Sequence, residues 1–400
     1  MSEIARSIDS DVVSTTVSKP KRMLSLDVLR GLTIGFMIIV NNQTGGGAFH
    51  PLTHAKWNGF TPTDLVFPTF LFLVGISTVL STAARMAKGE TRSTLFLHTL
   101  RRAVLLFVFG LIVNNFPFFH IHTARIYGVL PRIAICYLIV ATLYLISPTW
   151  KDKVVIAVAC LVGYWALMRF VPVPGFGVPT HDIPINDMNG NLTAYIDRHI
   201  FGASHLYEKV RDPEGLLSTI PSIATTLFGL LTGLWLRTKR AMEVKMSGIA
   251  MAGTAMVCAG AVWNFAFPIN KKLWTSSFAL FAGGWSLLLL ALAIYIIDIR
   301  RIGRKDVTRA DAPGHPTVYK PLLVFGTNAI LAYMVSELGD SILHNIHPAP
   351  GDTLKKMLYR TVFSVVHHSG FAALIYSLVF TFVCWLIVYP FYRKRIFLKI

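Results

Sequence analysis

Apolar runs long enough to cross a lipid bilayer recur along the chain and constrain its fold more than any other feature. A helix needs roughly 20 apolar residues to span the hydrocarbon core. We expect ten such helices, at approximately 24–40, 65–84, 100–113, 133–146, 154–171, 220–236, 246–267, 276–297, 322–338 and 371–392. Of the 400 residues, 54% are hydrophobic and 14% are charged, against about 25% charged in a soluble globular protein. The sequence therefore predicts an all-α, multi-pass membrane protein.

The basic residues predict how these helices are oriented. Lys and Arg gather in short segments on the side of the N-terminus, such as RRIGRK and the RKR near the end of the chain. Because basic loops stay in the cytoplasm, both termini are expected to be cytoplasmic. A net charge of +18 would suggest a nucleic-acid partner in a soluble protein. Here topology and contact with anionic lipid explain the charge, so we expect the lipid bilayer, and no nucleic acid, as a partner.

The domain organisation follows from the same pattern. Residues 1–23 are polar and rich in Ser and Thr, which predicts a disordered cytoplasmic tail, and 24–400 are expected to form a single membrane domain with a long outer loop at 172–219. Most polar segments lie on the outer side, so function is expected there or in a site that opens to it. The four cysteines lie singly in apolar runs, and the paired histidines lack acidic or cysteine companions at ligand spacing. No metal site is expected.

The stretch PLTHAKWNGFTPTDLVFP, between the first two spans, carries an unusual density of reactive side chains. His54 has an ordinary pKa near neutrality and is suited to proton transfer. Trp57 offers a stacking face, Asn58 an amide, and Asp64 a carboxylate at the mouth of the second span. These residues are candidates for a catalytic and substrate-binding site.

The first predicted span also contains polar residues. Asp27 and Arg30 are three residues apart, which places them on one face of a helix. Charges inside a span are costly and tend to be paired or functional, so the two form either a structural ion pair or part of a site for an anionic ligand. The span ends at Asn41 and Asn42, whose amides are expected to face the next loop.

A series of short motifs makes the chain recognisable. DVLRG, VNN, GGG, HAKWNGFTPTDLVFPTFLFLVG, RIYGVLPRI, YIDR, HLYEK, DPEGLLSTIPSI and PINKKLW follow in order between about residues 24 and 339. Together they resemble the heparan-alpha-glucosaminide N-acetyltransferase family, in particular bacterial members without the large lumenal domain. The resemblance implies a transmembrane acyltransferase type of fold in a bacterial plasma membrane. It also implies transfer of an acetyl group from acetyl-CoA to the amine of glucosamine or a terminal amino sugar.

The resemblance also implies roles for individual residues. His54 corresponds to the catalytic histidine of the family's H-A-x-W-N-G motif, and Asn41 to the asparagine that closes the first span. Two features depart from the animal pattern: the stretch between these residues is longer by about two, which leaves Asn41 and Asn42 as alternatives, and Pro131 stands where the animal members carry glutamine.

The expected chemistry suits these side chains. An amine must lose its proton before it attacks a thioester, and His54 is the expected general base; alternatively, it carries the acetyl group itself. The amide of Asn41 or Asn58 is a candidate donor to the oxygen of the tetrahedral intermediate. Both asparagines are equally explained as helix caps or loop ties.

Acetyl-CoA carries phosphates, which guanidinium groups bind well. Arg125 and Arg132 lie on the outer side against the topological charge bias, and this predicts a cofactor-binding role. Lys271 in PINKKLW is a similar exception, and Trp274 is available to stack on adenine. Glu214 either stabilises the start of a span or recognises the ammonium of the amino sugar.

The principal alternative is an amino-sugar permease that makes no bond. A permease would move glucosamine unchanged, whereas an acetyltransferase would release thiol from acetyl-CoA when the amine is present. The identity of the acceptor and the side from which acetyl-CoA enters do not follow from the sequence. A homodimer is expected only from its frequency among symmetric assemblies.

Overall fold

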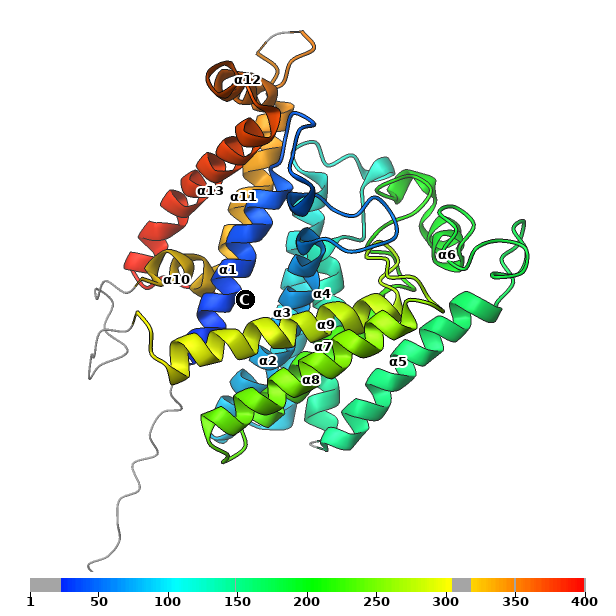
Figure 1. The fold of residues 1–400 in the computed structure, drawn as a ribbon, viewed down its shortest axis with the longest axis vertical. Coiled ribbons are helices and arrows are strands. Elements are labelled where there is room, and N and C mark those ends of the chain that lie inside the picture. The colour runs from blue at the N-terminus through cyan, green and yellow to red at the C-terminus, as the bar shows by residue number, and fades with distance from the viewer. Residues whose placement is uncertain (1–22, 148, 304–317, 349, 399–400) are drawn as a thin grey trace, which may run out of the picture.

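The computed structural model describes residues 23–147, 149–303, 318–348 and 350–398, and in these ranges the regular secondary structure is helical (Figure 1). Nine of the described helices are long and apolar enough to cross a membrane. They are α1 (Leu24–Asn41), α2 (Val66–Met86), α3 (Arg92–Asn115), α4 (Val129–Ile146), α5 (Trp150–Phe170), α7 (Thr219–Leu236), α8 (Met242–Trp263), α9 (Ser276–Ala293) and α13 (Ser369–Arg393). The predicted all-α membrane fold is confirmed.

The segment predicted as a tenth span is two helices rather than one. The sequence predicts a continuous helix at 322–338, but the structure has α10 (Lys320–Thr327) and α11 (Ala329–Asn345), bent by 86° at the break. Asn328 has φ −125° and ψ 43°, which is not helical, and Arg30 donates to the carbonyl of Gly326 at 3.3 Å. The last turn of α10 is therefore held against α1.

Two glycines allow this close contact between α1 and α10. A Cβ on Gly326 would lie 1.9 Å from the carbonyl oxygen of Asp27, and a Cβ on Gly31 would lie 1.8 Å from that of Leu322. Backbone meets backbone at both points, so no side chain can fit.

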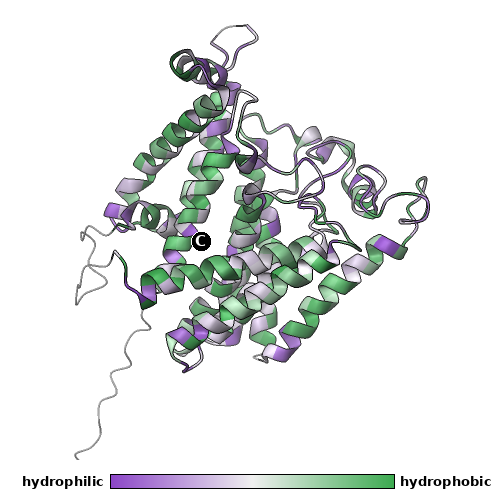
Figure 2. Cartoon of the chain, viewed as in Figure 1, coloured by the Kyte–Doolittle hydropathy of each residue, from purple (hydrophilic) through white to green (hydrophobic). Residues whose placement is uncertain are grey.

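The helices differ in how much of their surface the protein covers. The apolar windows of α4 and α7 are 61% and 67% buried, whereas those of α5 and α8 are 28% and 17% buried. Figure 2 shows apolar residues along the outward sides of these peripheral helices. An apolar exterior of this kind is suited to lipid, and α4 and α7 form the interior with α1 and α2.

The polar connections gather at the end of the bundle where α1 finishes and α2 begins. They include η1 (His50–Leu52), η2 (Pro62–Leu65), η3 (Ile121–Thr123) and, inside the predicted long loop, α6 (Leu192–Phe201) and η4 (Ala203–His205). A short helix, α12 (Leu354–Val366), joins α11 to α13, and a π-helical segment, η5 (Ile294–Ile299), extends α9. The predicted tail falls almost wholly on 1–22, outside the described residues. The single domain and the cytoplasmic termini stay predictions.

Candidate active site

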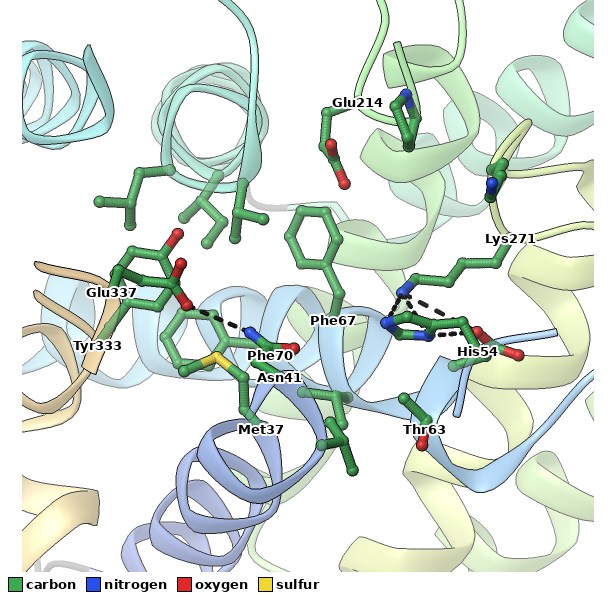
Figure 3. A pocket seen from close by; sticks show the side chains of 18 of the residues that line it. Met37, Asn41, His54, Thr63, Phe67, Phe70, Glu214, Lys271, Tyr333 and Glu337 are labelled. Carbon is green, nitrogen blue, oxygen red and sulfur yellow. Dashed lines mark hydrogen bonds and ion pairs between the residues drawn. The ribbon is translucent and has the colours of Figure 1, made fainter. Parts of the chain in front are cut away.

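A cavity of about 650 Å³ opens among the ends of α1, α2, α4 and α11 and the loops at that end of the bundle (Figure 3). Seven of the ten predicted site residues line it: Asn41, His54, Asp64, Arg125, Glu214, Lys271 and Trp274. Three do not line it: Trp57, Asn58 and Arg132. The fold thus brings together residues up to 233 positions apart in sequence, from Asn41 to Trp274.

His54 and Asp64 form a hydrogen-bonded pair in the cavity wall. The Nδ1 atom of His54 lies 2.8 Å from Oδ1 of Asp64. The other carboxylate oxygen accepts from the backbone N–H of Thr61 at 3.0 Å, its hydroxyl at 3.1 Å and the backbone N–H of Ala55 at 3.2 Å. A capping box at the start of η2 produces this arrangement. Because the carboxylate is an acceptor, Nδ1 carries the proton and Nε2 holds the lone pair.

The ammonium group of Lys271 lies against the same imidazole. Its Nζ is 3.0 Å from Nδ1 and 3.2 Å from Nε2 of His54, and 3.9 Å from Oδ1 of Asp64. Burial lowers the pKa of His54 below its ordinary value of 6.5 and the charge of Lys271 lowers it further, while the hydrogen bond to Asp64 acts in the opposite direction. At neutral pH the imidazole is therefore uncharged, the state that a general base requires.

Arg125 is paired with two carboxylates. Its Nε and Nη2 donate to Asp212 at 2.9 and 2.7 Å, and Nη2 also donates to Glu214 at 2.6 Å. Burial alone would raise the pKa of Asp212, but the hydrogen bonds from Arg125 hold that pKa below its usual range. The guanidinium also lies over the ring of Tyr207, 4.6 Å from its centre. A phosphate would have to compete with both carboxylates for this cation.

Arg132 and Trp274 are packed against each other inside the protein. Arg132 is 0% exposed, donates to the carbonyl of Gly215 at 2.9 Å and to the hydroxyl of Ser218, and lies 5.3 Å from the ring centre of Trp274. The indole donates to the hydroxyl of Thr225 at 3.2 Å and is 1% exposed. In this conformation the guanidinium joins α4 to the segment that leads into α7 and is covered by protein, whereas Trp274 lines the cavity.

Trp57 and Asn58 tie the outer loops together. The indole of Trp57 donates to the carbonyl of Asn186 at 2.9 Å. The side-chain oxygen of Asn58 accepts from the amide of Asn186 and, at 3.2 Å, from that of Asn270. These bonds connect the stretch before α2 to the two loops that cover it, which matches the loop-tying alternative for Asn58.

A second polar group lies on α11 and was missed in the sequence. Glu337 accepts a 3.2 Å hydrogen bond from the amide of Asn41, and Tyr333 lines the cavity beside it (Figure 3). The amide of Asn41 is directed to Glu337 rather than to His54. Two acidic residues, Glu337 and Asp340, lie within the otherwise apolar run 329–345, which is costly in a membrane, and this was the signal available in the sequence.

A smaller cavity of about 200 Å³ lies beside the large one, in the half of the bundle where α1 begins. Arg30, Ser77 and Arg102 line it. Arg30 donates to the hydroxyl of Ser77 at 2.6 Å and to Asp27 at 3.2 Å, so the predicted ion pair within the first span is present. The two cavities share four apolar side chains as lining: Phe70, Leu130, Ile133 and Ile330.

The described part of the chain contains no group of three or more His, Cys, Asp or Glu side chains arranged to hold a metal ion. The sequence-based expectation that no metal takes part stays a prediction.

Comparison with known proteins agrees with the motif pattern. The family model described as "Heparan-alpha-glucosaminide N-acetyltransferase, catalytic" matches residues 22–262. The chain is 29% identical over 453 residues to the heparan-alpha-glucosaminide N-acetyltransferase of Homo sapiens, covering 98% of this chain and 62% of that protein. It is 29% identical over 440 residues to the protein of the same name from Mus musculus, covering 96% and 62%. The chain thus spans less than two thirds of the length of these relatives.

Proposed function

The chain belongs to the heparan-alpha-glucosaminide N-acetyltransferase family, and from this premise we propose that it transfers an acetyl group from acetyl-CoA to the amine of glucosamine or of a terminal amino sugar. The observation that carries the proposal is the contact of His54 with Asp64 and Lys271 in the wall of a cavity of about 650 Å³. That volume is within the range of small-molecule sites. The proposed location is a bacterial plasma membrane.

His54 acts at its Nε2 atom in this proposal. Asp64 holds the Nδ1 proton, which orients the ring and stabilises the imidazolium that forms when Nε2 takes a proton from the amine. The arriving acceptor displaces the ammonium of Lys271 from Nε2. As the amine bonds to the thioester carbon, the C–S bond breaks and the imidazolium proton passes to the leaving thiolate of CoA. If His54 carried the acetyl group, the same nitrogen would attack the thioester with loss of the CoA thiolate, and the amine would then displace His54 from the acetyl group. Radiolabelled acetyl-CoA without acceptor separates the schemes, because only the carrier scheme leaves label on the protein.

Lys271 is then positioned to stabilise the oxygen of the tetrahedral intermediate. A charged donor close to the reacting nitrogen serves this purpose better than the amide of Asn41, which is already bonded to Glu337. One well-placed donor of this kind contributes about 3 to 4 kcal/mol to transition-state stabilisation. Asn41 as the donor stays a prediction, as do the cofactor contacts of Arg125, Arg132 and Trp274 and the substrate contacts of Trp57, Asn58 and Glu214.

The acyl arm of acetyl-CoA reaches His54, in this proposal, from the smaller cavity. That cavity lies in the half of the bundle that the basic residues predict to be cytoplasmic, and it contains the cations of Arg30 and Arg102. A volume of about 200 Å³ admits only part of the cofactor, so the nucleotide remains near the membrane face. The arm passes the shared apolar side chains when they move apart.

Thiol release by the purified chain tests the proposal. Acetyl-CoA should be consumed only when an amino sugar is present, and His54→Ala should lower kcat by about 10²- to 10⁴-fold. His50→Ala is the matched control, because His50 is exposed, four residues away and outside the cavity lining. Full turnover in His54→Ala protein would refute the role of His54. Transport of unmodified glucosamine into vesicles, without thiol release, would favour the permease.

A further inference from the structure

The α11 side of the large cavity carries a polar cluster that the reaction above does not use. Tyr333, Glu337 and Asp340 follow one another at helical spacing and all line the cavity, and Asn41 reaches them from the end of α1. Figure 3 shows Asn41, Tyr333 and Glu337 together on one side of the pocket, with His54 and Lys271 on the other and Phe67 between them.

Glu337 differs from the other carboxylates of the cavity in having no cationic partner within the described residues. The remaining four acidic side chains of the lining are each paired with His54, Arg125 or a lysine: Asp64, Glu208, Glu214 and Asp340. Glu337 has only the amide of Asn41 at 3.2 Å. An unpaired carboxylate at membrane depth is costly and is retained where it binds something.

Tyr333 supplies a second, independent indication of a ligand. The residue is 8% exposed and lines the cavity, and its hydroxyl oxygen is not among the fully buried, unbonded polar atoms of the described ranges. Since no described residue forms a hydrogen bond to it, the hydroxyl is accessible from the cavity and free to bond a ligand there. Tyr333 and Glu337 are one helical turn apart, and a single polar ligand can reach both.

The chemistry of this cluster matches hydroxyl groups. A carboxylate accepts from a hydroxyl, a phenol donates or accepts, and an amide does both. Because the reacting amine must lie at His54, the part of the acceptor that faces α11 is bound there without taking part in bond formation. Glu337 offers no favourable partner to an anionic group there, because its described contact is the amide of Asn41 and no ion pair joins it to a cation of the described residues.

We propose that Asn41, Tyr333 and Glu337 form an acceptor subsite that binds the hydroxyl groups of an uncharged sugar. The subsite rests on the proposed acetyltransferase function and deepens it. It selects amino sugars without a phosphate, sulfate or carboxylate on the portion that faces α11.

The first experiment compares acceptors and variants in the purified full-length chain. With glucosamine, Glu337→Gln and Tyr333→Phe should each raise the acceptor KM by about tenfold, as expected for loss of one buried hydrogen bond to a charged group or hydroxyl. The kcat and the KM for acetyl-CoA should change little. Wild-type protein should prefer glucosamine to glucosamine 6-phosphate, and Glu337→Gln should reduce that preference.

Two controls separate recognition from a structural role. Cyclohexylamine has an amine but no hydroxyl, so its kinetics should be the same in wild-type and Glu337→Gln protein. Asp340→Asn alters a cavity carboxylate that is bonded to Lys355 at 2.5 Å, and it should leave the preference for glucosamine over its 6-phosphate unchanged. Equal effects of Glu337→Gln on both amines, or an unchanged preference in that variant, would overturn the subsite.

Equilibrium binding keeps the two proposals distinguishable. Radiolabelled glucosamine should bind wild-type protein without acetyl-CoA, and Glu337→Gln should weaken that binding about tenfold. If this holds while no amine supports thiol release, the subsite stands and the acetyltransferase function fails. Wild-type protein that does not bind glucosamine refutes the subsite, whatever its activity toward other amines.

Discussion

Replacing Lys271 by methionine should move the pH dependence of the reaction in a defined direction. The substitution removes a positive charge that lies 3.0 Å from Nδ1 of His54 and keeps an unbranched apolar side chain. Because that charge lowers the pKa of His54, its loss raises the pKa. A general base loses activity as pH falls through its pKa, so the acidic limb of the profile should shift to higher pH.

The size of the shift follows from the distance. Two unit charges 3.0 Å apart interact by about 1.4 kcal/mol in water and about 5.5 kcal/mol at an effective dielectric constant of 20. The side chains of His54 and Lys271 are 45% and 19% exposed, so the interaction lies between these values and the water value is a lower bound. Since 1.36 kcal/mol corresponds to one pKa unit, the limb should move by at least about one pH unit.

The assay is kcat/KM for the acceptor as a function of pH, measured by thiol release. Titration of the acceptor amine is common to all variants and cancels in the comparison. Lys272→Met is the matched control: Lys272 lines the same cavity but donates to Glu208 at 2.8 Å, and its loss should leave the limb in place. If Lys271→Met is too slow to assay, the pH dependence of His54 modification by diethyl pyrocarbonate reports the same pKa.

Asp64→Asn gives a shift of opposite sign. The hydrogen bond to Asp64 raises the pKa of His54, so the limb should move to lower pH when the carboxylate is removed. An unmoved limb in Lys271→Met, or a shift in the same direction for Lys271→Met and Asp64→Asn, would refute the electrostatic account of His54.

Two further predictions concern packing and sidedness. Gly326→Ala places a Cβ 1.9 Å from the carbonyl oxygen of Asp27 and should destabilise the protein by about 1 to 3 kcal/mol. Gly163→Ala, with open space around its Cβ, should not destabilise it. Thermal inactivation in detergent compares the two variants, and equal stability would contradict the close packing of α10 against α1. In oriented vesicles, turnover should require acetyl-CoA on the side of the chain termini. Turnover only from the side of the outer loops would exclude the route through the smaller cavity.

The sequence predicted the spans well because the hydropathy of each segment alone indicates whether it can cross the membrane. The predicted 24–40, 220–236 and 371–392 lie within α1, α7 and α13. The break at Asn328 was missed, since it depends on contact between α10 and α1, a tertiary interaction that hydropathy along one segment does not report.

The site was predictable in part for the same reason. His54 and Asp64 lie ten residues apart, and their local sequence marks both. The contact of Lys271 with His54 joins positions separated by 217 residues, and no pattern in the sequence indicates it. Arg132 was expected in the cofactor site because it lies on the predicted outer side against the topological charge bias, and that role stays a prediction. The contacts of its guanidinium with Gly215 and Ser218 join distant segments and are not indicated by the sequence.

The four apolar side chains shared by the two cavities have a consequence for proton leakage across the membrane. A continuous water channel through the bundle would conduct protons, and each charge that crosses dissipates about 2.3 kcal/mol per 100 mV of membrane potential. Phe70, Leu130, Ile133 and Ile330 stand where such a channel would run. In the proposed route a flexible acyl arm would part these side chains and fill the gap as it enters, so the electrochemical gradient would survive each turnover.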